Sequence, residues 1–260
     1  MENKKRKSGM VLPPLRTRSD AGSVDDLVQT LRRSLPPELA DRLRAGAAPA
    51  EATDLPRVAT GIEAVDALLG GGFPRGRLTE ITGALSSGRT SLAHALLAAA
   101  TRAGEVAAVV DAADAFDAAS AAAAGVDLAR VRWARAPRPR AALRCAERLL
   151  EARGFGVVVV DLGIEREAPR PADRRAEDAA SLWMRMTRSA RASGTAFVLL
   201  APRAALGPFA ALTLETRATR PRFSVRPDWL EGLETQVVPL RTRIGGALGS
   251  ARVEWRFRSG

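Results

Sequence analysis

The chain has 260 residues, of which 46% are hydrophobic and 4% aromatic, which suits one α/β domain with a short appendage, or two small domains. The 40 Lys and Arg residues against 29 Asp and Glu residues give a net charge of +11, which favours contact with nucleic acid or an acidic partner. The single cysteine, Cys145, excludes an internal disulfide. No apolar run approaches the ~18 residues of a membrane span, and the basic start lacks the apolar segment of a secretory signal. We therefore expect a cytoplasmic, nucleoid-associated protein without membrane contact.

The first 56 residues predict an appendage to the core. Residues 1–22 are basic and aperiodic, which predicts a disordered arm. Residues 23–56 predict a helical element followed by a linker, because Ser23 is suited to an N-cap and apolar residues recur at helical spacing until Pro36. Such a helix either folds back on its own domain or docks on a partner, and the sequence leaves both alternatives open.

Residues 57–260 have the pattern of an α/β core. Buried strands are expected at 77–83, 106–112, 156–161 and 195–201, and helices at 90–102, 143–153 and 179–193. Strands that alternate with helices predict a mostly parallel central sheet flanked by helices. After Pro202 the helices stop. Further strands, expected at 211–218, 222–227, 236–243 and 251–258, predict an antiparallel extension at the C-terminus.

The segment GALSSGRTS has the frame of a nucleotide-binding phosphate loop, Gly-x-x-x-x-Gly-Lys-Ser/Thr, with arginine in the lysine position. It follows a predicted strand and opens a predicted helix, where glycines let backbone N–H groups turn toward an anion and the helix N-terminus favours negative charge. Thr90 supplies a hydroxyl for Mg²⁺, and Asp161 ends an apolar strand as an anchor for Mg²⁺ or water. The candidate residues for ATP and Mg²⁺ are Gly83, Ser86, Ser87, Gly88, Arg89, Thr90, Ser91 and Asp161.

Arg89 is the departure within this motif. The usual lysine reaches the β- and γ-phosphates as a compact, flexible charge, whereas a guanidinium is planar and forked, so the exchange is not conservative. We expect Arg89 to hold a phosphate without following the transferring group into the transition state. A tight glycine turn that binds no ligand is the alternative interpretation.

The residues around the motif resemble RecA and its relatives. The block LGGGFPRGR, residues 69–77, is similar to the segment that precedes the phosphate loop in that family. The Ser-Ser-Gly within the loop resembles bacterial RecA in particular. Downstream, VDAADAFD at 110–117 is similar to the family pattern [IV]-D-A-E-x-A-[LF]-D. The resemblance covers roughly residues 57–220 and implies a RecA-like fold.

The resemblance also implies functions that this chain has lost. The family's catalytic carboxylate, which activates the attacking water, falls on Ala113, and a methyl group cannot accept a proton. Asp114 lies next to it, but neighbouring side chains on a strand point to opposite faces. The glutamine that senses the γ-phosphate falls on Ala201 and Pro202. The second DNA-binding loop is reduced to residues 203–208, while the first corresponds to 162–180, where mixed charges favour a solvated loop.

A diverged RecA-like chain of this length with a short helical N-terminus resembles the ImuA family, which is encoded beside the polymerase-like ImuB in damage-inducible mutagenesis cassettes. The resemblance implies an adaptor without enzyme activity in SOS-induced translesion DNA synthesis, which binds and inhibits RecA or links it to ImuB. Two alternatives remain. One is a DNA-dependent ATPase with a divergent phosphate loop, and the other is a SulA-like cell-division inhibitor with no affinity for RecA or DNA.

Two groups of arginines are candidate contacts for DNA, without sequence specificity, or for an acidic protein. Residues 130–153 hold 8 basic and 2 acidic side chains, a net +6. Near the C-terminus, arginines alternate with apolar residues, which predicts a basic row on one face of a sheet. The candidates are Arg135, Arg138, Arg140, Arg144, Arg241, Arg243, Arg256 and Arg258. His94 is the only histidine, and we expect it to pack or lie on a helix surface, with no metal site.

Overall fold

The structure is a computed structural model that describes residues 55–163, 176–224, 230–245 and 249–257. The predicted arm at 1–22, the helical element from 23 to 54 and Arg258 lie outside the described residues, as does most of the predicted solvated loop at 162–180. Every statement below concerns the described part of the chain. None of its helices is long and apolar enough to cross a membrane.

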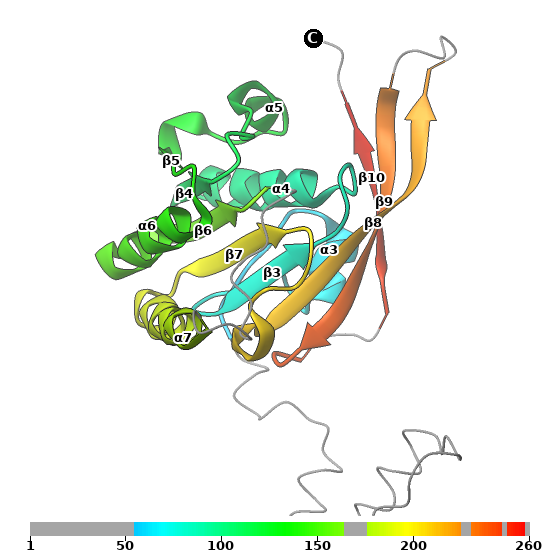
Figure 1. The fold of residues 1–260 in the computed structure, drawn as a ribbon. Coiled ribbons are helices and arrows are strands. Elements are labelled where there is room, and N and C mark those ends of the chain that lie inside the picture. Colours follow the sequence, from blue (N-terminus) through cyan, green and yellow to red (C-terminus); the bar gives the residue numbers. More distant parts are fainter. Residues whose placement is uncertain (1–54, 164–175, 225–229, 246–248, 258–260) are drawn as a thin grey trace, which may run out of the picture. The chain divides into compact units, whose positions relative to one another are not determined.

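A mostly parallel sheet forms the centre of the described structure, in the order β10-β9-β8-β3-β7-β6-β4-β5 (Figure 1). Its strands are β3 (Leu78–Thr82), β4 (Val106–Asp111), β5 (Val131–Arg135), β6 (Phe155–Asp161), β7 (Ala196–Ala201), β8 (Leu212–Phe223), β9 (Leu230–Thr242) and β10 (Ala251–Arg256). Strands β5, β4, β6, β7, β3 and β8 are parallel, whereas β9 is antiparallel to β8 and to β10. A separate antiparallel pair joins β1 (Arg57–Val58) to β2 (Phe73–Pro74). The predicted RecA-like α/β fold with an antiparallel C-terminal extension is confirmed.

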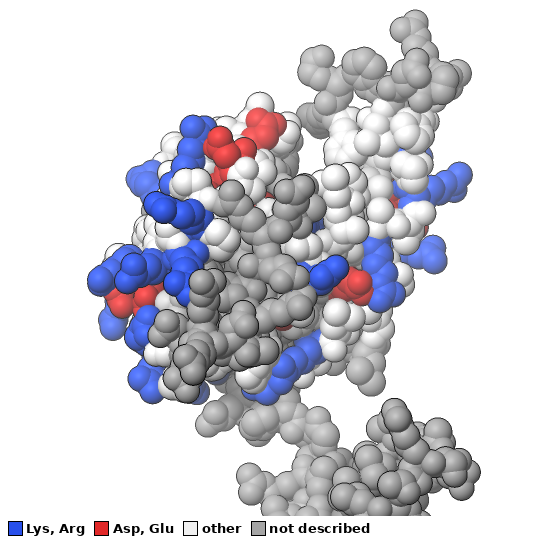
Figure 2. All heavy atoms as spheres, in the orientation of Figure 1, with Lys and Arg blue, Asp and Glu red and all other residues white. Residues whose placement is uncertain are grey.

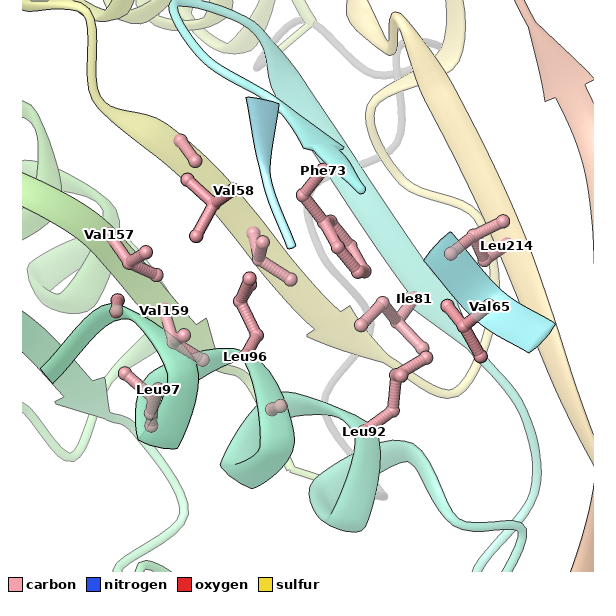
Figure 3. Packing of buried hydrophobic residues seen from close by; sticks show 14 of the residues in the cluster. Val58, Val65, Phe73, Ile81, Leu92, Leu96, Leu97, Val157, Val159 and Leu214 are labelled. Carbon is pink, nitrogen blue, oxygen red and sulfur yellow. The ribbon is translucent and has the colours of Figure 1, made fainter. Parts of the chain in front are cut away.

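Helices cover both faces of this sheet. The helices are α3 (Glu63–Leu68), α4 (Arg89–Arg102), α5 (Ala118–Ala123), α6 (Pro139–Ala152) and α7 (Ala176–Ser193). Successive strand residues point to opposite faces, so Val157 and Val159 pack with α4 (Figure 3), while Val158 and Val160 belong to the cluster of α6 and α7. Because both faces are buried, strands β6 and β7 are nearly unbroken apolar runs, and this is why the sequence identified them.

Several boundaries differ from the predicted ones, and β9 begins at Leu230 instead of 236. Helix α6 begins at Pro139 instead of 143, because proline is well suited to the first turn of a helix, where its missing N–H costs nothing. Strand β8 continues to Phe223, although separate strands were expected at 211–218 and 222–227. Pro221 is tolerated because β3 pairs with β8 only as far as Glu215. Beyond that point one edge of β8 has no neighbouring strand that would need the backbone N–H that proline lacks.

Glu80 fixes the short connection between β7 and β8. Its side chain lies in the middle of β3 and is only 1% exposed. One carboxylate oxygen accepts hydrogen bonds from the N–H groups of Ala205 (2.8 Å) and Leu206 (3.0 Å), and the other accepts from the Thr213 hydroxyl (2.8 Å). A buried carboxylate must be paired in this way to offset its lost hydration. The connection between β7 and β8 is therefore anchored to the core.

Candidate functional site

The phosphate loop lies at the carboxyl end of β3 and leads into α4. Gly88, the N-cap of α4, has φ of 93°, a left-handed conformation that favours glycine. A Cβ on Gly83 would lie 2.4 Å from the Thr216 carbonyl oxygen, and a Cβ on Gly88 would lie 2.5 Å from the Thr235 hydroxyl. The first turn of α4 contains no acidic residue, so the positive end of the helix dipole is not neutralised by the chain. The loop therefore has the backbone that a phosphate cradle requires.

A series of hydrogen bonds connects the antiparallel extension to this loop. The indole N–H of Trp255 in β10 donates to the Thr235 hydroxyl of β9 (2.9 Å), which donates to the Ser87 carbonyl oxygen (3.1 Å). The Thr216 hydroxyl of β8 donates to the Thr82 carbonyl oxygen (3.0 Å) and lies 2.8 Å from the Ser87 hydroxyl. Since a hydroxyl carries one proton, Ser87 is the donor to Thr216. Three strands thus fix the position of one loop residue.

Arg89 is the buried cation of the site. It is 8% exposed, and its Nη1 atom is buried without a hydrogen-bond partner among the described residues. Burial lowers the pKa of this guanidinium, and the nearby Asp161 carboxylate partly offsets that effect. An arginine still remains charged at neutral pH. A buried donor without a partner costs about 1–3 kcal/mol, and a phosphate oxygen would satisfy it, so these residues fit an anion.

The remaining predicted residues of the site differ in exposure. Ser87 is buried with Gly83 and Gly88, Ser91 is half-buried, and Ser86 and Thr90 are exposed. Asp161 is the last residue of β6, and its carboxylate accepts from the Gly163 N–H (2.8 Å). Burial raises the pKa of Asp161, the Gly163 N–H and Arg89 lower it, and Asp111 raises it. The structure thus places Asp161 close enough to Arg89 for their charges to interact.

The residues present also fit a nucleotide-bound magnesium ion. The described residues include no cluster of three or more His, Cys, Asp or Glu side chains suited to a metal. Mg²⁺ bound with a nucleotide takes most of its ligands from phosphates and water and only one or two from protein. Thr90, at the start of α4, and Asp161 are the side chains that would reach it.

Ala113 stands beyond the end of β4, beside Gly163. A Cβ on Gly163 would lie 2.7 Å from the Ala113 Cβ, so the position assigned to the family's catalytic carboxylate faces the segment that follows Asp161. The strand alternation expected above does not apply to Asp114, because β4 ends at Asp111. Asp114 has φ of 54° in a turn after the strand, and its carboxylate pairs with Arg135 of β5 at 3.1 Å.

His94 is buried in α4 and makes an edge contact with Phe116, with ring centroids 5.8 Å apart. Its Nε2 atom is buried without a hydrogen-bond partner among the described residues. Burial lowers the pKa of His94, and the charge of Asp117 raises it only in part. The packed position expected for this residue is therefore confirmed.

The burial of His94 predicts that the stability of the fold depends on pH. Because its folded pKa lies below its unfolded value near 6.5, the unfolded chain binds the proton more tightly, and stability is lost as pH falls below about 6.5. A His94→Leu variant should lose less free energy of unfolding than the wild type between pH 7.5 and pH 5.0, measured by urea denaturation. Equal losses in the two proteins would contradict this assignment.

The arginines of residues 130–153 gather where β5 leads into α6, and Figure 2 shows basic side chains on the side where Figure 1 has these elements. Arg135 and Arg138 lie at the carboxyl end of β5, and Arg140 and Arg144 lie one turn apart on α6. All four are exposed. The register and packing place Arg135 on the α4 face of the sheet and α6 on the opposite face, so this predicted group lies near one edge of the sheet without sharing one face.

The C-terminal arginines do not form the single row that alternation predicted. Arg241 donates to the Gly207 carbonyl oxygen (2.6 Å), and Arg243 donates to the Pro208 carbonyl oxygen (2.9 Å), so both stabilise the turn before β8. Arg256 pairs in register with Gly232, which is about 30 Å from Arg241 along β9 at ~3.4 Å per residue. The antiparallel hairpin separates them, and contact of these residues with DNA stays a prediction.

Sequence reasoning missed three residues that hold the phosphate loop, namely Thr216, Thr235 and Trp255. Thr216 and Thr235 are buried polar residues in strands of the extension, more than 100 positions from the loop. Their side chains matter only because β8 pairs with β3 and β9 pairs with β8. No local sequence pattern predicts such a contact, since it depends on strand order and register.

Comparison with known proteins agrees with this architecture. A family model described as the RecA N-terminal domain matches residues 43–171. The chain is 38% identical over 104 residues to RecA of Picosynechococcus sp. and 43% identical over 105 residues to RecA of Rubrobacter xylanophilus. Each match covers 40% of this chain and 30% of the relative. The chain therefore spans about a third of the length of these relatives.

Proposed function

From the RecA-like domain that this chain carries, we propose that it is a nucleotide-binding adaptor that does not hydrolyse ATP. The observation that carries the proposal is the combination of a formed phosphate cradle with Ala113 in the place of the family's water-activating carboxylate. Arg89 would hold the phosphates, and Thr90 and Asp161 would reach their Mg²⁺. Asp114 forms an ion pair with Arg135 at 3.1 Å, and the resemblance to RecA offers no other carboxylate as the general base.

The adaptor acts, in this proposal, in SOS-induced translesion DNA synthesis. The support is the resemblance to the ImuA family together with the short connection at 203–208, which leaves no room for a second DNA loop of the family's length. The partners would be RecA, whose strand exchange it would slow, the polymerase-like ImuB, and DNA without sequence specificity. The protein would act in the cytoplasm, at the nucleoid.

ATP turnover by the purified protein, with and without single-stranded DNA, tests the central claim. We expect no turnover above background in either condition, because a general base contributes about 10²–10⁴-fold to such reactions. Binding of a fluorescent ATP analogue, measured in parallel, should be retained and should weaken in an Arg89→Ala variant. Turnover that DNA stimulates would overturn the proposal.

A DNA-dependent ATPase is the second candidate. The specific observation in its favour is that Thr90 and Asp161, the residues that would reach Mg²⁺, stand in place at the start of α4 and the end of β6. It requires a general base other than the residue at 113. The same turnover assay separates the two candidates, and an Ala113→Glu variant should raise turnover only if the adaptor proposal is correct.

A further inference from the structure

The exposed sides of helices α6 and α7 adjoin on one face of the sheet. Both helices bury apolar side chains in the same core cluster, Leu150 from α6 and Trp183 from α7. The Nε atom of Arg185 in α7 donates to the Glu147 carboxylate of α6 at 2.6 Å. The two helices therefore form one continuous layer, on the side of the sheet opposite α4.

Arginines dominate the solvent side of this layer. We call them the α6–α7 arginine face, and they are Arg140, Arg144, Arg148, Arg185, Arg188 and Arg191, all exposed. The acids among the described side chains of the two helices are Glu147 and Glu151. Glu151 pairs with Arg148 at 3.0 Å and Glu147 pairs with Arg185, so the other four arginines have no carboxylate partner within the described part of the chain. Figure 2 shows basic side chains where Figure 1 has these helices.

Folding gains little from this arrangement of charge. Arg140 lies in the first turn of α6, where the helix dipole favours acids. Arg140, Arg144 and Arg148 follow one another at intervals of four residues, and like charges at this spacing slightly destabilise a helix. Among the described residues, Arg188 donates only to the Met184 sulfur (3.5 Å), which is a weak acceptor. These charges, which the fold does not use, are available to an anionic partner.

The layer carries this charge without an apolar centre. Met184 is the only large apolar side chain that is exposed among the described residues of the two helices. Protein interfaces bury a core that is apolar and rich in aromatic residues, whereas interfaces with DNA are more polar and much more positively charged. The composition of the layer therefore favours the phosphate backbone of a nucleic acid over an acidic protein.

We propose that the α6–α7 arginine face binds the phosphate backbone of double-stranded DNA. The planar guanidinium offers a phosphate two parallel donors. The stripe from Arg140 to Arg148 extends ~12 Å along α6 at 1.5 Å per residue, a length over which a duplex carries about seven phosphates. The described residues of the two helices expose no aromatic side chain on which an unpaired base could stack. Because the duplex also has the denser charge, we expect it to bind more tightly than a single strand, without preference for sequence.

This inference rests on the proposed function only in that both include contact with DNA. It assigns that contact to the outer side of α6 and α7, whereas Arg89 and Thr90 begin α4 on the opposite side of the sheet. Binding of the ATP analogue should therefore be unchanged when arginines of the face are substituted, and the two proposals can fail separately.

Fluorescence anisotropy of a labelled 20-base-pair duplex, titrated with the full chain at several salt concentrations, tests the face. An Arg144→Gln/Arg188→Gln variant should bind about tenfold more weakly, and its slope of log K against log salt should become shallower by about 1.8, since each phosphate contact of a duplex contributes ~0.9. Both helices should tolerate the change, because glutamine is a good helix former. The matched control, Arg220→Gln/Arg252→Gln, removes the same charge from exposed residues of the C-terminal strands and should bind within about twofold of the wild type.

Competition separates DNA from an acidic protein as the partner. Unlabelled poly-L-glutamate, added at the same concentration of charge, should displace the labelled duplex less effectively than unlabelled duplex does, and equal displacement would assign the face to an acidic protein instead. Circular dichroism and urea unfolding of each variant establish that it is folded. Absence of duplex binding by the wild type, equal losses in the two double variants, or tighter binding of single-stranded oligo-dT than of the duplex would overturn the inference.

Discussion

A Glu80→Ala variant is expected to lose about 3–5 kcal/mol of its free energy of unfolding, at the upper end of single substitutions. Hydrogen bonds to charged groups contribute about 1.5–3 kcal/mol each, and Glu80 makes three of them inside the core. Truncation leaves the N–H groups of Ala205 and Leu206 without their acceptor. Equilibrium denaturation in urea at pH 7.5 measures the loss directly.

Glu80→Gln is the matched control for this prediction. Its amide oxygen can accept from both N–H groups, while its NH₂ group donates to the Thr213 hydroxyl, which is free to rotate. We therefore expect a loss of about 1 kcal/mol, the scale of one neutral hydrogen bond. If the alanine variant is as stable as the glutamine variant, the connection after β7 is not held by this carboxylate.

The sequence predicted the core of the fold because buried parallel strands and the phosphate loop each leave a local pattern. Val157–Val160 is apolar at every position, which only a strand covered on both faces requires. The glycines at 83 and 88 have positive φ within the turn of the motif itself. These features depend on residues close in sequence, and for that reason they could be predicted without a structure.

The surroundings of the loop could not be predicted in this way. Whether Asp114 replaces a base depends on its turn and on Arg135 in the next strand, and Trp255 of β10 connects to Ser87 through Thr235 of one further strand, β9. The arginines at 241 and 256 have the same spacing pattern, yet the hairpin sends them to opposite ends. Strand order and register decide these contacts, and neither can be predicted from the local periodicity of the sequence.

In the proposed adaptor, the hydrogen bonds that hold Ser87 would link nucleotide binding to the C-terminal extension. A phosphate that drew the loop toward itself would have to lengthen the hydrogen bonds of Ser87 with Thr216 and Thr235, or move their strands. Trp255 ends this chain of donors and is half-buried, so its environment would change with the loop. An adaptor needs such a link if the presence of a nucleotide is to alter the surface that a partner meets.

A restored ATPase is the second large effect that we expect. In the double variant Arg89→Lys/Ala113→Glu, lysine regains the flexible charge that follows the transferring phosphoryl group, and glutamate regains a base beside Asp161 and Gly163. Turnover of ATP should rise at least about 100-fold above the wild-type background, the lower end of a general-base contribution. Release of inorganic phosphate at pH 7.5 with Mg²⁺ measures it.

The control Arg89→Lys/Ala113→Gln separates the base from the binding of the nucleotide. Glutamine matches glutamate in size and reach but cannot accept the proton, so this variant should bind the ATP analogue as the glutamate variant does and stay at background turnover. Equal turnover in the two double variants would show that residue 113 is not the position of the base. If both double variants rose equally above background, the loss of activity would be assigned to Arg89, because a buried, forked guanidinium held near Asp161 cannot move with the γ-phosphate as it departs. Background turnover in both would instead contradict the assignment of either residue.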